Sequence, residues 1–368
     1  MLLVHKLYIK EFLRVLGVLV IGLSLVFSII SLIDKVDDLL PFDPSVAQLL
    51  EYAVLQVPRL IHYLLPMAIL LGSLFVFAQA IKRREIVAIK AAGGRMKRVL
   101  VPFIVLGVVL TLFGFALSEL LIPPSVKRLA AVIEEITMKK REVSFKGGTL
   151  YMRSRDGSVV RVSLYLPDQR LAQGVTIFTV EGGGLKQRID AERATWAGDR
   201  WRLMKVKVLN LAEGKTEEFP EMDYKGIESE EVFREEMWKT VSMSLSDLFR
   251  YQERLAEAGF KNEKIDVDIG SRLSYPLINF FMLLLGIALS LGDAPQRLLH
   301  RAGVAESRTH GTLVTAGFGL VISLAYWFGY SFFLSLGYAG ILPPRAAPWV
   351  MPAVFSVLSF WLYRLIPE

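Results

Sequence analysis

The residue types that could carry out chemistry are scattered along this sequence rather than grouped. The chain has no cysteine, and its four histidines are isolated: His5, His62, His300 and His310. It also lacks a phosphate-binding G-x-x-x-x-G-K-[ST] loop, a G-x-S-x-G nucleophile elbow and an H-E-x-x-H zinc pair. Without cysteine, disulfides and thiolate metal sites are excluded. We therefore expect a chain that is not an enzyme and that holds no metal or cofactor.

The most informative polar segment is REIVAIKAAGG, at residues 84–94. It predicts a short helix at about 84–92, with an acidic residue in its first turn and glycines at its end. An apolar face on such a helix offers a cytoplasmic partner a surface to bind, and a basic loop that only fixes topology is the alternative. The residues expected to contact the partner are Arg84, Glu85, Ile86, Ile89 and Lys90.

Six apolar stretches are long enough to cross a membrane. Of the 368 residues 53% are apolar, and the mean hydropathy is +0.43. About 20 apolar residues in a helix cross roughly 30 Å of hydrocarbon. The expected spans are Phe12–Ile33, Leu60–Ala80, Val99–Ile122, Leu273–Leu291, Gly311–Leu336 and Ala346–Ile366.

A long polar block separates the third span from the fourth. We therefore expect a membrane protein with an α-helical bundle of six transmembrane helices and an inserted all-β, jelly-roll-like periplasmic domain. Its expected parts are residues 1–122 with the first three spans, 123–271 with the inserted domain, and 272–368 with the last three spans.

Within the polar block, apolar and polar residues alternate as they do in half-buried strands. Val160, Val162 and Leu164 are examples, and strands are expected over about 142–228. A helical return to the membrane should follow over 244–270. Ser246 is the expected N-cap of this helix and Gly259 lies near its expected end.

Basic residues in the short loops predict the orientation. The 81–98 loop holds seven basic residues against one acidic residue, whereas the 34–57 loop is acidic. Lys and Arg near span ends stay in the cytoplasm, so both termini are expected there and the inserted domain in the periplasm. Residues 123–271 hold 25 basic and 25 acidic side chains, so the net charge of +7 comes from the membrane parts. This distribution argues against a nucleic-acid partner.

Two charged residues, Glu119 and Arg59, are expected near the outer ends of the third and second spans. A structural ion pair or snorkelling at the interface is favoured over a functional role, although charges inside a membrane are often functional. An intramembrane enzyme would need polar catalytic residues within the spans. The candidates Ser118, Asn279 and His62 have no evident partners in the sequence.

Small residues recur every four positions in the fifth span, at Gly311, Thr315, Gly319 and Ser323. They share one helix face, which allows another helix to approach closely. Tight packing within the bundle is the simplest interpretation.

Three spans, a β domain and three more spans together resemble the LptF/LptG permease family of the lipopolysaccharide exporter, an ABC transporter. The resemblance covers essentially the whole chain and rests on the segments HKLYIKEFLRVLGVLV, VPRLIHYLLPMAILLGSLFVFAQAIKRREIVAIKAAGG and RIDAERATWAGDRWRLMKV. The segments SLIDKVDDLL, SLSDLFRYQERLAEAG and RLSYPL look closer to LptG than to LptF.

This resemblance implies a permease subunit of the cell inner membrane. Such a subunit pairs with an LptF-type paralogue and extracts lipopolysaccharide. It binds an LptB-type ATPase dimer through the helix at 84–92, and its β domain passes the lipid to a bridge of LptC and LptA type. ATP and Mg²⁺ would be held by the ATPase rather than by this chain.

The resemblance also implies two regions that meet the lipid. In the family, basic residues near the outer end of the first span contact the lipid A phosphates. Here Lys35 lies among acidic residues, a departure from that pattern, and Lys127 and Arg128 are alternatives. The first and fifth spans border a lateral opening in the family, so the stripe of small residues in the fifth span would act as a lateral gate.

Another ABC permease class, for lipoprotein or lipid export, is the alternative. Those permeases usually place the external domain after the first span. They would give one plus three spans rather than three plus three.

Overall fold

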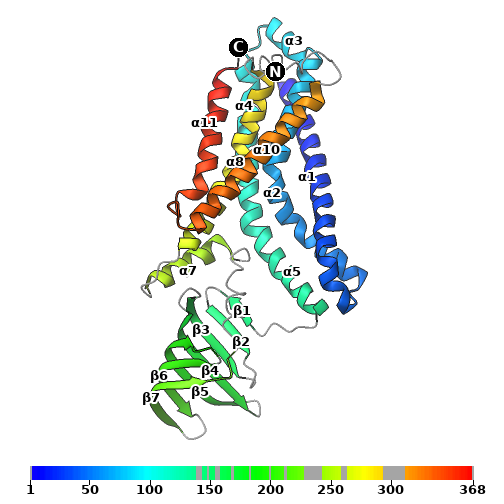
Figure 1. Cartoon of the computed structure of the whole chain (residues 1–368). Helices are drawn as coiled ribbons and strands as arrows, with labels where there is room; N and C mark the ends of the chain where they lie inside the picture. Colours follow the sequence, from blue (N-terminus) through cyan, green and yellow to red (C-terminus); the bar gives the residue numbers. More distant parts are fainter. Residues whose placement is uncertain are drawn as a thin grey trace. The chain divides into compact units, whose positions relative to one another are not determined.

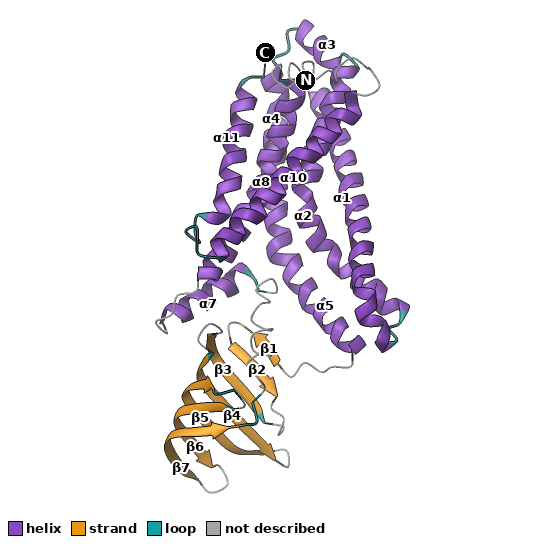
Figure 2. Ribbon diagram, in the orientation of Figure 1, coloured by secondary structure: helices purple, strands orange, loops and turns teal. Residues whose placement is uncertain are grey.

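The chain folds into two compact units. The structure, a computed structural model, describes residues 2–137, 143–146, 149–153, 158–166, 170–181, 184–198, 200–210, 214–227, 243–257, 263–292 and 311–366. We call Met1–Val132 together with Glu263–Glu368 the membrane unit, and Ile133–Asn262 the sheet unit. The described strands all belong to the sheet unit (Figure 2).

Long helices form the membrane unit (Figure 1). In chain order they are α1 (Leu2–Leu39), α2 (Val46–Lys82), α3 (Glu85–Ala91), α4 (Met96–Ala116), α8 (Glu263–Leu291), α10 (Gly311–Tyr338) and α11 (Val350–Arg364). The short 3₁₀ turns η1 (Leu40–Phe42) and η5 (Ala347–Trp349) follow α1 and precede α11. A π-helical turn, η2 (Leu117–Leu121), joins α4 to α5 (Ile122–Thr137).

Five described helical segments are long and apolar enough to cross a membrane: His5–Phe42, Val46–Lys82, Met96–Thr137, Glu263–Leu291 and Gly317–Tyr338. The sixth expected span is present as α11, whose 15 residues rise only about 22 Å. The third and fourth segments extend beyond the expected spans, because α5 continues α4 past Ile122 and α8 begins at Glu263. The helical bundle with an inserted all-β domain is confirmed.

Helix α8 forms the centre of the membrane unit. In its most apolar stretch 72% of the residues are buried, against 17% in α1 and 22% in α10. It contacts α2, α4 and α11. The α2 contact is so close that a Cβ atom on Gly286 would lie 1.8 Å from Oγ of Ser73, so only glycine fits there.

Polar side chains of α8 bind backbone carbonyls of its neighbours. Tyr275 donates its hydroxyl to the Tyr63 carbonyl of α2 over 2.9 Å, and the Asn279 amide donates to the Leu110 carbonyl of α4 over 3.4 Å. Interhelical hydrogen bonds of this kind contribute about 0.6 kcal/mol each in membranes. They therefore align α8 with its neighbours more than they add to stability.

Seven antiparallel strands make the sheet of the second unit. They are β1 (Val143–Lys146), β2 (Thr149–Arg153), β3 (Val159–Leu166), β4 (Leu171–Glu181), β5 (Gly184–Trp196), β6 (Trp201–Asn210) and β7 (Lys215–Tyr224). Each strand pairs with the next along the chain, so the sheet is a sequential meander.

One face of this sheet carries its hydrophobic core. The alternation expected in β3 is confirmed, since Val160, Val162 and Leu164 are buried. Val160 and Val162 join a cluster around Trp201, whose ring packs edge-on against Tyr165 at 6.1 Å between centroids. The pleat alternates side chains between the two faces, so this pattern fixes the register of the strands.

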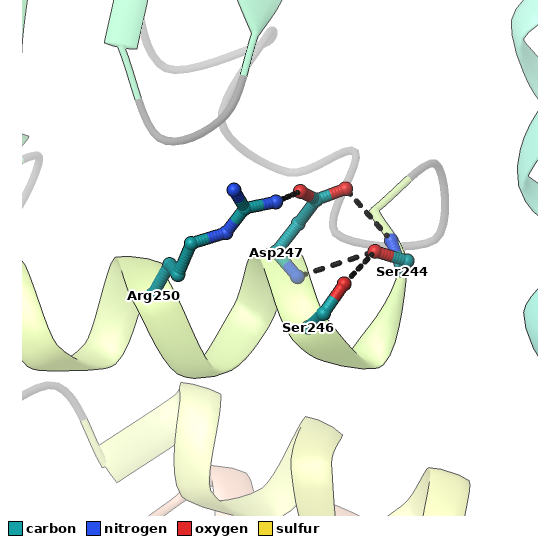
Figure 3. Close-up of polar contacts among 4 residues, drawn as sticks. All are labelled: Ser244, Ser246, Asp247 and Arg250. Carbon is teal, nitrogen blue, oxygen red and sulfur yellow. Dashed lines mark hydrogen bonds and ion pairs between the residues drawn. The ribbon is translucent and has the colours of Figure 1, made fainter.

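Helix α7 (Leu245–Glu257) follows the sheet in the chain, and its N-cap is Ser244 rather than the expected Ser246. The Ser244 hydroxyl accepts from the Asp247 amide at 3.2 Å, and the Asp247 carboxylate accepts from the Ser244 amide at 3.3 Å (Figure 3). This reciprocal pair is a capping box, which Ser246 cannot make because it lies directly before Asp247 in the sequence. The Ser246 hydroxyl instead contacts that of Ser244, and Gly259 lies outside the described residues.

The capping box predicts a pH-dependent contribution to the stability of α7. Partial burial opposes ionisation of Asp247, but hydrogen bonds from Ser244 and Arg250 outweigh it and lower its pKa. A lowered pKa contributes stability above the unfolded-state value of 3.8 that is lost as the pH falls through the folded-state value. In hydrogen exchange at neutral pH, Asp247→Asn should weaken α7 protection by about 1 kcal/mol.

The difference between the parent and Asp247→Asn should shrink as the pH falls below 3.8. Ser246→Ala is the matched control, because its hydroxyl caps no backbone amide in the structure. Equal losses of hydrogen-exchange protection in Asp247→Asn and Ser246→Ala would contradict the assignment of Ser244 as the N-cap.

Candidate functional site

The short helix α3 lies between α2 and α4, as the sequence predicts. It lies at the same end of the membrane unit as both chain termini (Figure 1). Helix α2 ends at Lys82, and Arg84 adopts a left-handed conformation with φ of 60° immediately before α3 begins. Helix α3 ends at Ala91. Gly93 then takes φ of +74°, and the Gly94 amide donates to the Ile89 carbonyl over 2.9 Å. The left-handed conformations of Arg84 and Gly93 separate α3 from α2 and α4.

The apolar face of α3 packs against the chain's own core. Ile86 is only 8% exposed, and Ile89 packs against the same cluster. Ile86 is buried and Ile89 is partly buried within the chain itself, and their expected contact with a partner stays a prediction. A seven-residue helix carries one narrow apolar stripe, and the membrane unit itself covers it. The exposed face instead presents Val87, which is 64% exposed, together with Arg84 and Ala88.

Glu85 is held by its neighbours. The buried Tyr8 hydroxyl of α1 donates to its Oε2 over 2.7 Å, and Nη1 of Arg83 lies 3.9 Å from its Oε1. The same Arg83 nitrogen lies 3.9 Å from Oε1 of Glu11. Lys90 is half-buried in the last turn of α3. Glu85 therefore joins α3 to α1.

Two of the three candidate phosphate ligands already pair with carboxylates. Nζ of Lys35 on α1 lies 2.7 Å from Oδ2 of Asp38, and Nε of Arg128 on α5 lies 2.8 Å from Oε1 of Glu51 on α2. These exposed pairs contribute at most about 1 kcal/mol, so an anion can replace the carboxylate. Lys127 is exposed and makes no ion pair within the described part of the chain.

Lys35 and Arg128 lie at the same end of the membrane unit. The outer half of α1 packs along the start of α2, where Ser28 donates to the Ala53 carbonyl over 2.7 Å and Ser31 donates to Gln56 over 2.9 Å. Lys35 lies one helical turn further along α1, beside the first turns of α2. The same turns of α2 hold Glu51, which pairs with Arg128. The structure thus brings the candidate cations to one region.

Gly319, in the stripe of small residues of the fifth span, faces α2 of the same chain. A Cβ atom on Gly319 would lie 2.4 Å from Cδ1 of Leu74 and 3.0 Å from Cδ2 of Leu71. Ser323 is 5% exposed. The side chains of Gly311 and Thr315 lie outside those the structure describes. Packing against α2 accounts for Gly319, and a role of the stripe as a lateral gate stays a prediction.

An ion pair that the sequence did not suggest lies near the opposite end of the membrane unit from α3. Nη1 of Arg272 on α8 lies 3.6 Å from Oε1 of Glu119 in the π-helical turn. Arg59, the other charged residue expected near the outer end of a span, lies over the Tyr63 ring at 5.8 Å from its centroid. Because α8 begins at Glu263, Arg272 lies inside a helix, directly before the expected start of the fourth span.

The polar residues considered for an intramembrane enzyme do not form a catalytic group. Asn279 binds a backbone carbonyl, and His62 packs against the Tyr275 ring at 5.0 Å between centroids. Ser118 is buried, and no hydrogen bond among these three residues is present in the described chain. The described residues also include no cluster of three or more His, Cys, Asp or Glu side chains that could hold a metal ion.

Comparison with known proteins gives one match across nearly the whole chain. The family described as lipopolysaccharide export system permease LptF/LptG matches residues 6–365. No curated protein matches the chain. The matched range includes both units and all the candidate residues above.

The packing of Gly319 leads to a stability prediction. Gly319→Leu should force Leu74 and Leu71 apart, at a cost of about 1–3 kcal/mol for overpacking, and lower the melting temperature of the purified protein in detergent. Gly317→Leu is the matched control two residues earlier, since a Cβ atom there meets nothing within 4 Å. Equal melting temperatures for the two variants would show that the stripe is not packed on α2.

Proposed function

Because this chain belongs to the LptF/LptG family of lipopolysaccharide export system permeases, we propose that it extracts lipopolysaccharide from the inner membrane and passes it to a periplasmic bridge. It is the LptG-type subunit of an ABC transporter, with an LptF-type paralogue beside it. An LptB-type ATPase dimer binds the ATP and Mg²⁺, so this chain is not itself an enzyme. Bridge proteins of LptC and LptA type receive the lipid from the sheet unit.

Uneven burial of the spans is the observation that carries this proposal. In their most apolar stretches α2 and α8 are 61% and 72% buried, whereas α1 and α10 are 17% and 22% buried. The outward residues of α1 and α10 are large and apolar, among them Val18, Ile21, Val321 and Phe328. These two helices therefore offer apolar surface to lipid or to a second subunit.

A lipid cargo requires such a surface. Burial of each CH₂ group stabilises by about 0.8 kcal/mol, so exposing one twelve-carbon chain to water costs on the order of 10 kcal/mol. Lipopolysaccharide carries several such chains. A permease for this molecule needs an apolar cavity that opens sideways to the bilayer, and α1 and α10 are the spans free to border it.

The layout of the chain argues against the alternative permease class. Lipoprotein-release and efflux permeases usually carry their external domain after the first span. Here the sheet unit follows the third apolar helix and precedes α8. An intramembrane enzyme has still less support, given the arrangement of Ser118, Asn279 and His62.

The proposal assigns roles to the candidate residues. The segment Arg84–Lys90 transmits force from the ATPase, with Val87 on its exposed face as the docking residue and Ile86 and Ile89 as its anchors in the bundle. Lys127 and Arg128, with Lys35, contact the lipid phosphates. The exposed face of α10, rather than Gly319, borders the lateral gate.

Docking of the ATPase is tested at Val87. Val87→Asp places a desolvated charge in the proposed interface, and we expect at least tenfold less ATPase to co-purify with the permease. Val46→Asp is the control, because Val46 is 83% exposed at the other end of α2. Undiminished co-purification of Val87→Asp would contradict the docking role.

Orientation is tested with single cysteines, which this chain otherwise lacks. We propose that the termini and α3 are cytoplasmic and that the sheet unit is periplasmic, since the basic loops favour the cytoplasm. In spheroplasts, a membrane-impermeant thiol reagent should label Glu217→Cys in β7 at once. Lys97→Cys at the start of α4 should be labelled only after lysis. The reverse pattern would overturn this orientation.

A further inference from the structure

Tyr8 carries a buried hydroxyl that the proposed function leaves without a role. Its side chain is 2% exposed, and its ring packs against Phe77 of α2 at 6.2 Å between centroids. The hydroxyl donates to Oε2 of Glu85 over 2.7 Å. A single hydrogen bond thus joins α1 to α3, across 77 positions of the sequence.

This bond is stronger than the other polar link between α1 and the start of α3 that the described residues show. The other link is Arg83, whose Nη1 lies 3.9 Å from Oε1 of Glu11 and 3.9 Å from Oε1 of Glu85. More than half of the Arg83 side chain is exposed. Exposed ion pairs at that distance contribute little. A hydroxyl bound to a carboxylate is a charge-assisted bond and is roughly twice as strong as a neutral one.

A short helix and a largely exposed span lie on either side of the bond. Helix α3 has only seven residues and follows Arg84, whose left-handed conformation separates it from α2. Helix α1 packs along α2, but its most apolar stretch is the least buried of the candidate spans. A movement of α3 could bend the chain at Arg84 without moving the other helices. A contact between α3 and α1 is needed for α1 to follow that movement.

We propose that the Tyr8 hydroxyl is a positioning group for transport, which makes α3 and the adjoining end of α1 move as one body. It fixes Glu85 and thereby passes the displacement of α3 by the ATPase to the span that borders the lipid. This role rests on the proposed function of α3 as the ATPase-binding helix.

The test compares Tyr8→Phe with Tyr363→Phe in the complete complex with its ATPase. The proteins are reconstituted in vesicles that contain lipopolysaccharide, and the lipid released per ATP hydrolysed is measured. Loss of one hydrogen bond to a charged group should lower this ratio roughly tenfold in Tyr8→Phe, with normal co-purification of the ATPase. Tyr363 is the matched control, a half-buried tyrosine of α11 whose hydroxyl makes no hydrogen bond within the described chain.

A covalent link should restore what Tyr8→Phe loses. Tyr8→Cys with Glu85→Cys also removes the bond, and a short bifunctional thiol reagent that joins the two cysteines should raise the ratio again. An unchanged ratio in Tyr8→Phe, or no recovery on cross-linking, would overturn the proposal. Loss of ATPase binding in Tyr8→Phe would also overturn it, since the hydroxyl would then serve docking alone. Failure of the docking role itself is detected separately by the Val87→Asp variant.

Discussion

The absence of water from the bilayer is the constraint on which the membrane unit depends. Every backbone amide and carbonyl inside hydrocarbon needs a partner, so the apolar segments form helices and any irregular turn needs side chains to complete it. Helix α8 supplies several of these side chains. Its Tyr275, Asn279 and Ser290 bind carbonyls of α2 and α4, and its Arg272 pairs with Glu119 at the one π-helical turn among the described residues. One central helix thus sets the positions of its neighbours.

A rigid centre leaves the periphery free for function. The helices packed around α8 bury their small residues against one another, whereas α1 and α10 keep large apolar side chains on the outside. The short helix α3 is fastened to this rigid part by Ile86 and to the peripheral α1 by Tyr8. A device that converts nucleotide binding into movement of lipid needs such a combination, because force must pass through a rigid contact and end at an element that can move.

Local patterns in the sequence predicted most of the elements. They did not predict the contacts between residues that are far apart in the sequence. Hydropathy located the spans, and alternation located β3 through Val160 and Val162. The capping rule could have identified Ser244, since Asp247 follows it by three residues. The partner of Glu119 is Arg272, 153 positions away, and no local signal connects them. Amphipathicity showed that Ile86 and Ile89 share a face, but the same pattern serves a partner and the chain's own core equally well.

The sequential order of the strands bears on how the protein is made. Each strand of β1 to β7 pairs with the one just synthesised, so the sheet can form by short-range contacts without the final spans. The membrane unit cannot do the same, because α8 is made after the sheet unit. At the usual 5–20 residues per second, α2 and α4 wait on the order of ten seconds in the bilayer with Ser73 and the Leu110 carbonyl uncovered. During biogenesis the half-built bundle is thus a substrate for whatever shields polar groups in the membrane until α8 arrives.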